Sequence, residues 1–299
     1  MRVVLFGKDG QLGWELQRSL APLGEVVALG RKGHDGLCGD LTDSDGIART
    51  LAQLAPDVIV VAAAYTAVDK AEVESESAYA VNAQVLAVMA QFAEQRGAWL
   101  MHYSTDYVFN GEGSLPWLET DCTAPLNVYG ASKLAGEAAI IASGCQYLIF
   151  RTSWVYAARG NNFAKTMLRL GRERDSLSVV EDQWGAPTGA ELLADASVQA
   201  LCQAMKKPAL GGLYHLAASG ETSWHGYAQF VLAQARSAGE AIKVAPDAVL
   251  PVASSAFPTP AQRPKNSRLN TTKFQQAFGL CLPHWQQGVQ RMLIEVLEA

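Results

Sequence analysis

The sequence predicts an α/β protein: a doubly wound parallel sheet with a smaller C-terminal lobe. Short apolar runs rich in valine and isoleucine alternate with amphipathic segments through the first half of the chain. A glycine-rich turn follows the first of these runs directly, at residues 7–13. After about residue 152 the regular alternation ends. Together these features are typical of a parallel sheet with helices on both faces, followed by a second lobe.

The composition indicates a globular protein that acts on a small molecule. The chain has 299 residues, 49% of them hydrophobic, and a formal net charge of -5, which argues against nucleic acid or a polybasic membrane anchor as partner. We see neither a signal peptide nor an apolar run long enough to span a membrane, so we expect a cytoplasmic protein. Five scattered cysteines suggest reduced thiols, and the five histidines show no metal-ligand spacing.

The first strand and turn predict a dinucleotide site. A strand is expected at residues 2–6 and a helix from about residue 14 to residue 20. Between them, Gly7 would permit a tight turn, Gly10 would let a diphosphate approach the backbone, and Gly13 would let the helix pack on the strand. The amides of Gly10, Gln11 and Leu12 would point at the diphosphate. A glycine turn without a ligand is the alternative, but the flanking strand and helix favour a cofactor.

The second strand, at residues 25–29, predicts which cofactor is used. An acidic residue at this strand end would favour NAD, whereas here Gly30 is followed by Arg31 and Lys32, which suit a 2′-phosphate. We therefore predict NADPH, with NADH as the alternative if the two cations are merely solvated. The segment Gly39, Asp40 and Leu41 follows, and Asp40 would meet the adenine amino group or cap a helix over residues 43–54.

The third and fourth strands predict the rest of the cofactor and substrate site. The third, near residues 57–61, ends in Ala62, Ala63, Ala64 and Tyr65, whose small side chains leave room for a cofactor. A helix over residues 78–95 carries Asn82, which would satisfy backbone groups or support a proton relay. The fourth strand, residues 98–103, delivers Ser104 and Thr105 at its carboxyl end, where ligands of such sheets bind and where two hydroxyls can hold a carbonyl oxygen.

Tyr129 is the predicted general acid, and Lys133 is the predicted neighbour that lowers the pKa of its phenol. Residues four apart in a helix share one face, so the two side chains would stand one turn apart. A phenol with a pKa of about 10 is a weak proton donor at neutral pH, and a neighbouring ammonium would lower that pKa. The spacing also occurs by chance in solvated helices, but the nearby Ser104 and Thr105 favour catalysis.

These features together resemble the extended short-chain dehydrogenase/reductase family. That resemblance implies a Rossmann domain over residues 1–152, which binds the dinucleotide. It also implies a mainly substrate-binding lobe over residues 153–299, with some segments returning to the first domain. Further blocks resemble the members of this family that reduce 4-keto sugar nucleotides. They are STDYVF (104–109), PLNVYG (125–130), FRTSWVY (150–156), GNNFAK (160–165), DQWGAPT (182–188) and RPKNSRLN (263–270).

The resemblance implies a dTDP-linked 4-keto-6-deoxy sugar as substrate, with Tyr129, Lys133, Thr105 and Ser104 as catalytic residues. Some members dimerise around a magnesium ion, so a homodimer with Mg²⁺ at its interface is a further expectation. The substrate-binding residues would be Ser104, Thr105, Tyr107, Trp154, Asn162, Lys165 and Arg263, and the metal ligands would be Glu15, Glu191 and Glu295.

Of the related functions, the sequence argues against a dehydratase and leaves an epimerase, another 4-keto sugar-nucleotide reductase and a non-catalytic binding subunit as alternatives. The sugar-nucleotide dehydratases follow the threonine with an Asp-Glu pair, whereas here Asp106 is followed by Tyr107, so the eliminating glutamate is absent. Epimerases, or reductases of other 4-keto sugar nucleotides, share the same catalytic residue types. A non-catalytic binding subunit would not need an intact pair of Tyr129 and Lys133.

Overall fold

The fold is built on a six-stranded parallel sheet, described by a computed structural model that covers residues 1–298. The strand order is β10-β5-β4-β3-β1-β2, and every neighbouring pair is parallel. The order therefore switches between β1 and β3, which is where such sheets bind ligands. The predicted fold class is confirmed. The strands are β1 (Arg2–Phe6), β2 (Glu25–Leu29), β3 (Val58–Val61), β4 (Trp99–Thr105), β5 (Gln146–Thr152) and β10 (Gly212–His215).

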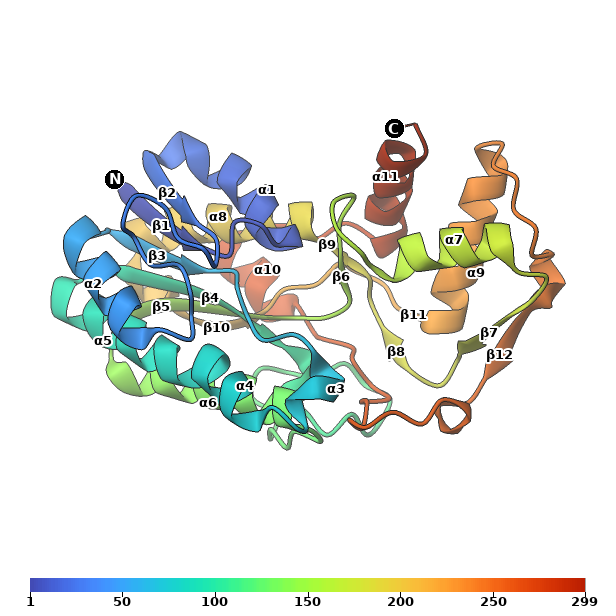
Figure 1. Cartoon of the computed structure of the whole chain (residues 1–299), viewed down its shortest axis with the longest axis horizontal. Helices are drawn as coiled ribbons and strands as arrows, with labels where there is room; N and C mark the ends of the chain where they lie inside the picture. Colours follow the sequence, from blue (N-terminus) through green and yellow to red (C-terminus); the bar gives the residue numbers. More distant parts are fainter. Residues whose placement is uncertain (299) are drawn as a thin grey trace.

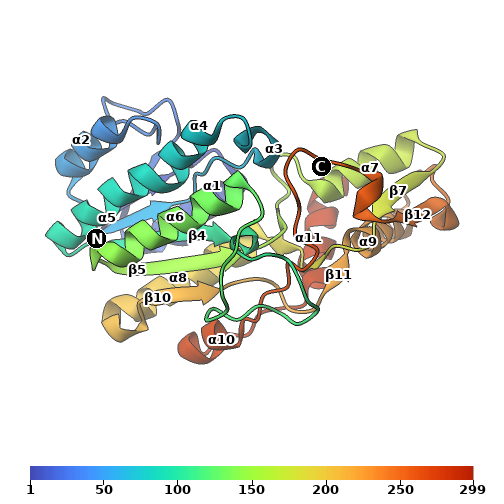
Figure 2. The same ribbon diagram turned by 90° about the horizontal axis from the view of Figure 1, so that it is seen from below.

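Helices cover both faces of this sheet (Figure 1). Alternate residues of β1 show why: Val3 and Leu5 pack in one apolar core, and Val4 and Phe6 pack in the other. Figure 2 shows α5 and α6 side by side on the second face. The first core is closed by α1 (Gln11–Leu20), α8 (Ala190–Lys206) and α10 (Thr272–Phe278), and the second by α2 (Ser44–Leu54), α5 (Val85–Arg96) and α6 (Val128–Ser143).

A third apolar core lies away from the sheet, on the right in Figure 1. It gathers α7 (Phe163–Glu173), α9 (Trp224–Ser237) and α11 (Trp285–Leu297) around the parallel pair β7 (Leu177–Val180) and β12 (Val249–Val252). Three later elements, α8, α10 and β10, pack with the large sheet instead. The division of the chain at residue 152 stays a prediction. Shorter strands are β6 (Val155–Tyr156), β8 (Trp184–Gly185), β9 (Thr188–Gly189) and β11 (Thr222–Ser223).

The helix expected over residues 78–95 is interrupted. It consists of α4 (Ser75–Tyr79), a π-helical turn at Ala80–Gln84 and then α5. Such turns are rare and are found mostly at functional sites. Asn82 lies in this turn, accepts a 2.9 Å hydrogen bond from the Tyr65 amide and donates to the Tyr65 carbonyl at 3.2 Å. Of its two predicted roles, the structure therefore supports the satisfaction of backbone groups.

Short helical turns complete the chain, and within residues 1–298 no helix is long and apolar enough to cross a membrane. The turn after β4 matters most, because it begins at Asp106 beside the predicted catalytic residues. These turns are α3 (Val68–Ala71) and the 3₁₀ helices at Ala21–Leu23, Asp106–Val108, Pro208–Leu210, Pro246–Ala248 and Ser254–Ala256.

Candidate active site

The glycine turn after β1 is shaped for a close backbone approach. Gly7 has φ = +98°, and a Cβ at this position would lie 2.7 Å from the Ala63 amide nitrogen. A Cβ on Gly13 would lie 1.9 Å from the Gly7 carbonyl oxygen. Gly10 precedes α1 in an extended conformation, and the Oε1 atom of Gln11 is buried without a hydrogen-bond partner. The turn thus presents a bare helix N-terminus and a free acceptor, which fits a dinucleotide diphosphate and its sugars.

The segment after β2 places two cations at the same edge. Arg31 and Lys32 are exposed, and Arg31 Nε lies 3.9 Å from Asp40 Oδ1. Asp40 accepts hydrogen bonds from the Thr42 amide at 3.0 Å and the Thr42 hydroxyl at 2.9 Å, so it orders its own turn. The helix cap is Asp43, which accepts from the Gly46 amide at 2.8 Å. The expectation that Asp40 caps this helix is therefore wrong.

The other predicted cofactor residues line the switch point. Ala62, Ala63 and Ala64 follow β3, are only partly buried, and stand opposite the Gly7 turn. Gly39 packs tightly, because a Cβ there would lie 2.1 Å from the Gly30 carbonyl oxygen. Small residues on both sides of the switch point leave backbone surface exposed to a flat ligand. Leu12 and Leu41 instead pack in the two cores through their side chains.

Ser104, Thr105 and Tyr129 meet at the carboxyl end of β4. Thr105 ends that strand, and Tyr129 lies in the first turn of α6, which Asn127 caps by accepting from the Gly130 amide at 2.8 Å. Burial raises the pKa of the Tyr129 phenol, and the neighbouring Thr105 hydroxyl lowers it. Ser104 Oγ is buried without a partner, which leaves it free for a substrate oxygen. Thr105 and Tyr129 thus lie near each other, while a shared role with Ser104 in holding a carbonyl oxygen stays a prediction.

Lys133 is almost fully buried one helical turn away, and its contacts differ from the expected ones. Its Nζ donates to the Tyr103 carbonyl at 2.6 Å and lies 3.0 Å from His102 Nε2. Burial lowers the pKa of Lys133 to about 7, while the charge of Glu137 raises it. The pKa of Tyr129 is raised, chiefly by burial, and Lys133 does not lower it in this arrangement. The prediction of a phenol made acidic by its lysine is wrong here, because the ammonium is held by β4.

A buried ion pair lies below this lysine. Arg151, on β5, donates to Glu137 twice, from Nε to Oε1 at 2.9 Å and from Nη2 to Oε2 at 2.6 Å. Both side chains are at most 5% exposed, and the guanidinium lies over the Phe109 ring at 5.0 Å. The pair fixes α6 to β5 and supplies the negative charge nearest Lys133 along its helix.

A cavity of about 1000 Å³ opens beside the hydroxyl cluster. Of the predicted substrate residues, Tyr107 and Arg263 line it, and the Tyr107 ring meets the Tyr129 ring edge to face at 5.6 Å. Arg263 Nη2 is paired with Asp69 at 2.7 Å, and Nη1 lies 3.5 Å from the Tyr107 hydroxyl. The cavity is large enough for a nucleotide sugar, and the arginine at its wall suits a diphosphate.

Three other predicted substrate residues support the wall and do not line the cavity. Trp154 stacks on Trp224, which does line it, with ring centroids 3.6 Å apart. Asn162 caps α7 by accepting from the Lys165 amide at 3.1 Å. Lys165 Nζ donates to the Ala158 carbonyl at 2.8 Å. Sequence reasoning therefore missed Trp224, which lies 70 residues from Trp154 and becomes its neighbour only in the folded lobe.

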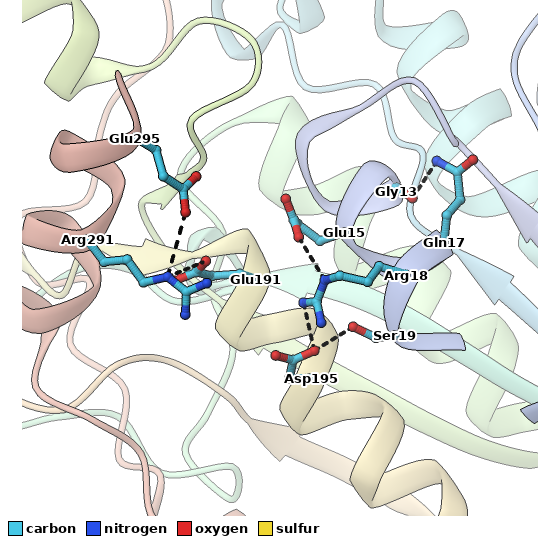
Figure 3. A network of polar contacts seen from close by, with 9 residues as sticks. All are labelled: Gly13, Glu15, Gln17, Arg18, Ser19, Glu191, Asp195, Arg291 and Glu295. Carbon is cyan, nitrogen blue, oxygen red and sulfur yellow. Dashed lines mark hydrogen bonds and ion pairs between the residues drawn. The ribbon is translucent and has the colours of Figure 1, made fainter. Parts of the chain in front are cut away.

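The predicted metal ligands do not form a metal site within one subunit. In the described part of the chain, no group of three or more His, Cys, Asp or Glu side chains could hold an ion. The three glutamates contact arginines instead (Figure 3). Glu191 and Glu295 each lie 3.6 Å from Arg291 Nε, and Glu15 pairs with Arg18 at 3.5 Å. Within one subunit these carboxylates belong to a network with arginines on α1, α8 and α11, and a magnesium ion between two subunits stays a prediction.

Comparison with known proteins agrees with this geometry. The sequence is 58% identical over 296 residues to the dTDP-4-dehydrorhamnose reductase of Escherichia coli (strain K12), covering 99% of this chain and 98% of that protein. A crystal structure of a dTDP-4-dehydrorhamnose reductase from Clostridium acetobutylicum matches at 34% identity and a TM-score of 0.88, covering 100% of both chains. That of the Bacillus anthracis reductase in complex with NADP matches at 37% and 0.86, covering 98% of this chain and 99% of that chain.

The family-level match extends over the same length. Residues 1–298 match the family described as the RmlD substrate binding domain. A Thermus thermophilus UDP-glucose 4-epimerase in complex with NAD, only 21% identical, shares the fold with a TM-score of 0.80. The chain therefore belongs to the RmlD family of dTDP-4-dehydrorhamnose reductases.

Proposed function

We propose that this chain catalyses the NADPH-dependent reduction of the 4-keto group of dTDP-4-dehydro-6-deoxy-L-mannose, giving dTDP-L-rhamnose. The observation that carries the proposal is the meeting of Ser104, Thr105 and Tyr129 at the end of β4, beside the glycine turn and a large cavity. The reductase name of the relatives, up to 58% identical over nearly the whole chain, supports it. Reduction of a ketone needs a hydride and one proton, and this site offers the proton donor.

Each residue of the site has a task in this reaction. The reduced nicotinamide, when bound, supplies the hydride to C4 of the sugar. Ser104 and Thr105 hold the carbonyl oxygen, and the unpartnered Ser104 Oγ supports this role. Tyr129 gives its proton to that oxygen as negative charge develops on it. Lys133, one helical turn from Tyr129, would hold the nicotinamide ribose when the cofactor is bound.

We propose NADPH as the preferred cofactor. Arg31 and Lys32 are exposed at the end of β2, where a 2′-phosphate would lie, and the only carboxylate recorded near Arg31 within residues 1–298 is 3.9 Å away. The NADP in the Bacillus anthracis relative supports the same choice. NADH remains usable if the two cations contribute little.

We propose that Arg263 binds the diphosphate of the substrate. Its present partner, Asp69, is itself 41% exposed, so the pair can open at small cost when an anion competes for the guanidinium. Trp154, Asn162 and Lys165 contribute to the sugar site indirectly, through Trp224 and the start of α7. Tyr107 lies between the cavity and Tyr129 and would contact the sugar.

The direct test follows nicotinamide absorbance with dTDP- and GDP-linked 4-keto-6-deoxy sugars side by side. We expect turnover of the dTDP substrate with NADPH, and a fall of about 10²–10⁴-fold in kcat for Tyr129→Phe, since a positioned general acid contributes this much. A matched control is Tyr79→Phe, in α4 and outside the hydroxyl cluster. A Tyr129→Phe variant that is folded and as fast as the parent would remove Tyr129 as the acid and with it this mechanism.

We further propose a cytoplasmic homodimer, in which α1, α8 and α11 face the partner. Burial raises the pKa of Glu191, and the charges of Glu295 and Glu15 raise it further, so a second cation near these carboxylates would be favourable. We propose that this cation is a magnesium ion bound between the two subunits. Light scattering with and without a chelator tests both, and a mass and activity that chelation leaves unchanged would remove the metal.

A further inference from the structure

Asp106 is a buried carboxyl group that the mechanism above does not use. It directly follows Thr105, begins the 3₁₀ turn after β4, and is 2% exposed. It forms no ion pair with any of residues 1–298. Burial raises its pKa to about 7, although the hydroxyls of Ser267 and Thr105 lower it. Both protonation states of Asp106 are therefore populated at neutral pH.

The Thr105 hydroxyl connects Asp106 to the proton donor. It donates to Asp106 Oδ1 at 3.1 Å and accepts from the Tyr107 amide at 3.1 Å. It also lies close enough to the Tyr129 phenol to lower the pKa of that group. A hydroxyl has one hydrogen and two lone pairs. Because the Tyr107 amide can only donate, it always occupies one lone pair of the Thr105 oxygen. The other lone pair and the hydroxyl hydrogen are left for Asp106 and Tyr129.

With Asp106 ionised, the directions of these bonds are fixed. The carboxylate can only accept, so the Thr105 hydrogen points at Asp106. The remaining lone pair of Thr105 is then available to the nearby Tyr129 hydroxyl as an acceptor. Both hydroxyls are thus directed away from any oxygen bound beside Ser104, and neither can stabilise charge on it.

With Asp106 protonated, the directions reverse. The acid can donate to Thr105 Oγ1, whose lone pairs are then both filled, by Asp106 and by the Tyr107 amide. The hydrogens of Thr105 and Tyr129 become free to point at the substrate oxygen. We propose that Asp106 is a positioning residue whose protonation turns the hydroxyls of Thr105 and Tyr129 toward the carbonyl to be reduced.

Other titratable groups face Asp106, Thr105 and Tyr129, and their effects on a pH profile must be distinguished from that of Asp106. Tyr107 and Tyr129 both have raised pKa values, in part because of the charge of Asp106, so they stay protonated at neutral pH. Arg263 and Asp69 act on Tyr107 from the cavity side. Lys133, whose pKa is about 7, would lose its charge over the same pH range and give a second dependence. A pH profile of the parent alone would therefore not identify Asp106.

The test compares the parent with Asp106→Asn, whose amide can donate to Thr105 at every pH. The inference rests on the proposed reduction, so the first readout is kcat against pH with NADPH and the dTDP-linked 4-keto sugar. We expect the slope of log kcat above pH 8 to be shallower by one in Asp106→Asn, and the variant to be roughly thirtyfold faster than the parent at pH 8.5. Asp175→Asn, which removes an exposed carboxylate paired with Lys243, should keep the parent's profile. An Asp106→Asn profile equal to the parent's would overturn the proposal.

A second readout needs no turnover. In protein with ¹³C-labelled tyrosine rings, the Tyr129 Cζ resonance should titrate near pH 7 in the parent and stay constant in Asp106→Asn. If that variant does not fold, Ser267→Ala serves, because loss of its hydroxyl raises the pKa of Asp106 and should move this titration to higher pH. A Tyr129 signal insensitive to both substitutions overturns the inference. Absence of turnover by the parent instead counts against the proposed function alone, since the resonance still reports the coupling.

Discussion

Substitution of Glu137 by glutamine should strongly destabilise the protein, although the two side chains have nearly the same size and shape. The change leaves the Arg151 guanidinium buried at the end of β5 without its counter-charge. Of the two hydrogen bonds of 2.6 and 2.9 Å, the amide oxygen can accept only one, and the amide NH2 faces the other guanidinium donor. Both side chains are at most 5% exposed, so water cannot replace the lost partner. Removal of one member of a buried pair typically costs about 3–5 kcal/mol, and we expect the free energy of unfolding to fall by that amount.

Urea unfolding of the apoprotein, followed by circular dichroism, measures this change. The matched control is Glu173→Gln, which breaks an exposed pair with Arg169 at 3.0 Å and should cost less than about 1 kcal/mol. The double variant Glu137→Leu/Arg151→Met removes both charges and should lose less than Glu137→Gln alone. If Glu137→Gln costs no more than Glu173→Gln, the assumption that this pair is desolvated and mutually dependent is wrong.

Three further outcomes test other parts of the molecule. Gly13→Ala would place a Cβ 1.9 Å from the Gly7 carbonyl oxygen, so we expect a loss of about 1–3 kcal/mol in thermal unfolding and weaker NADPH binding by fluorescence titration. Arg31→Ala combined with Lys32→Ala should lower kcat/KM for NADPH about 10–100-fold and leave that for NADH nearly unchanged, whereas equal losses would contradict the predicted phosphate contact. The pKa of Lys133 falls from 10.5 to about 7 on folding, so unfolding binds a proton between these pH values and stability rises with pH across this window. Lys133→Met should therefore gain about 2–4 kcal/mol at pH 7 in urea unfolding, with a smaller gain at pH 10, while turnover is lost.

The sheet was predictable because each strand is a short run of apolar residues that can be recognised without knowledge of the rest of the chain. Val58–Val61 is a run of β-branched residues buried on both faces, which only a parallel strand between two helical layers accommodates. The placement of Tyr129 and Lys133 one turn apart on α6 was predictable for a similar reason, since four-residue spacing in a helix fixes a common face. The interrupted helix around Asn82 was not, because a π-helical turn leaves no mark in apolar periodicity.

The contacts of Lys133 needed the structure, although one signal was present. Side chains alternate along a strand, so His102 and Ser104 share a face of β4, and the position of Ser104 already implied that His102 faces the same helix. Sequence patterns do not identify which acceptor a buried lysine ammonium will hydrogen-bond. That depends on distances between β4 and α6 set by all the packing around them.

The late completion of the large sheet has a consequence during synthesis. Five of its strands are finished by Thr152, but the face formed by residues such as Val3, Leu5 and Met101 is only partly covered by α1 until α8 and α10 follow, and α10 ends at Phe278. At about 5–20 residues per second, a ribosome needs roughly 6–25 s to make the intervening stretch. During that time the growing chain would display part of an apolar surface, and we expect that surface to be a binding site for a holdase chaperone. A fragment ending near residue 152 would keep that surface permanently and should aggregate when expressed alone.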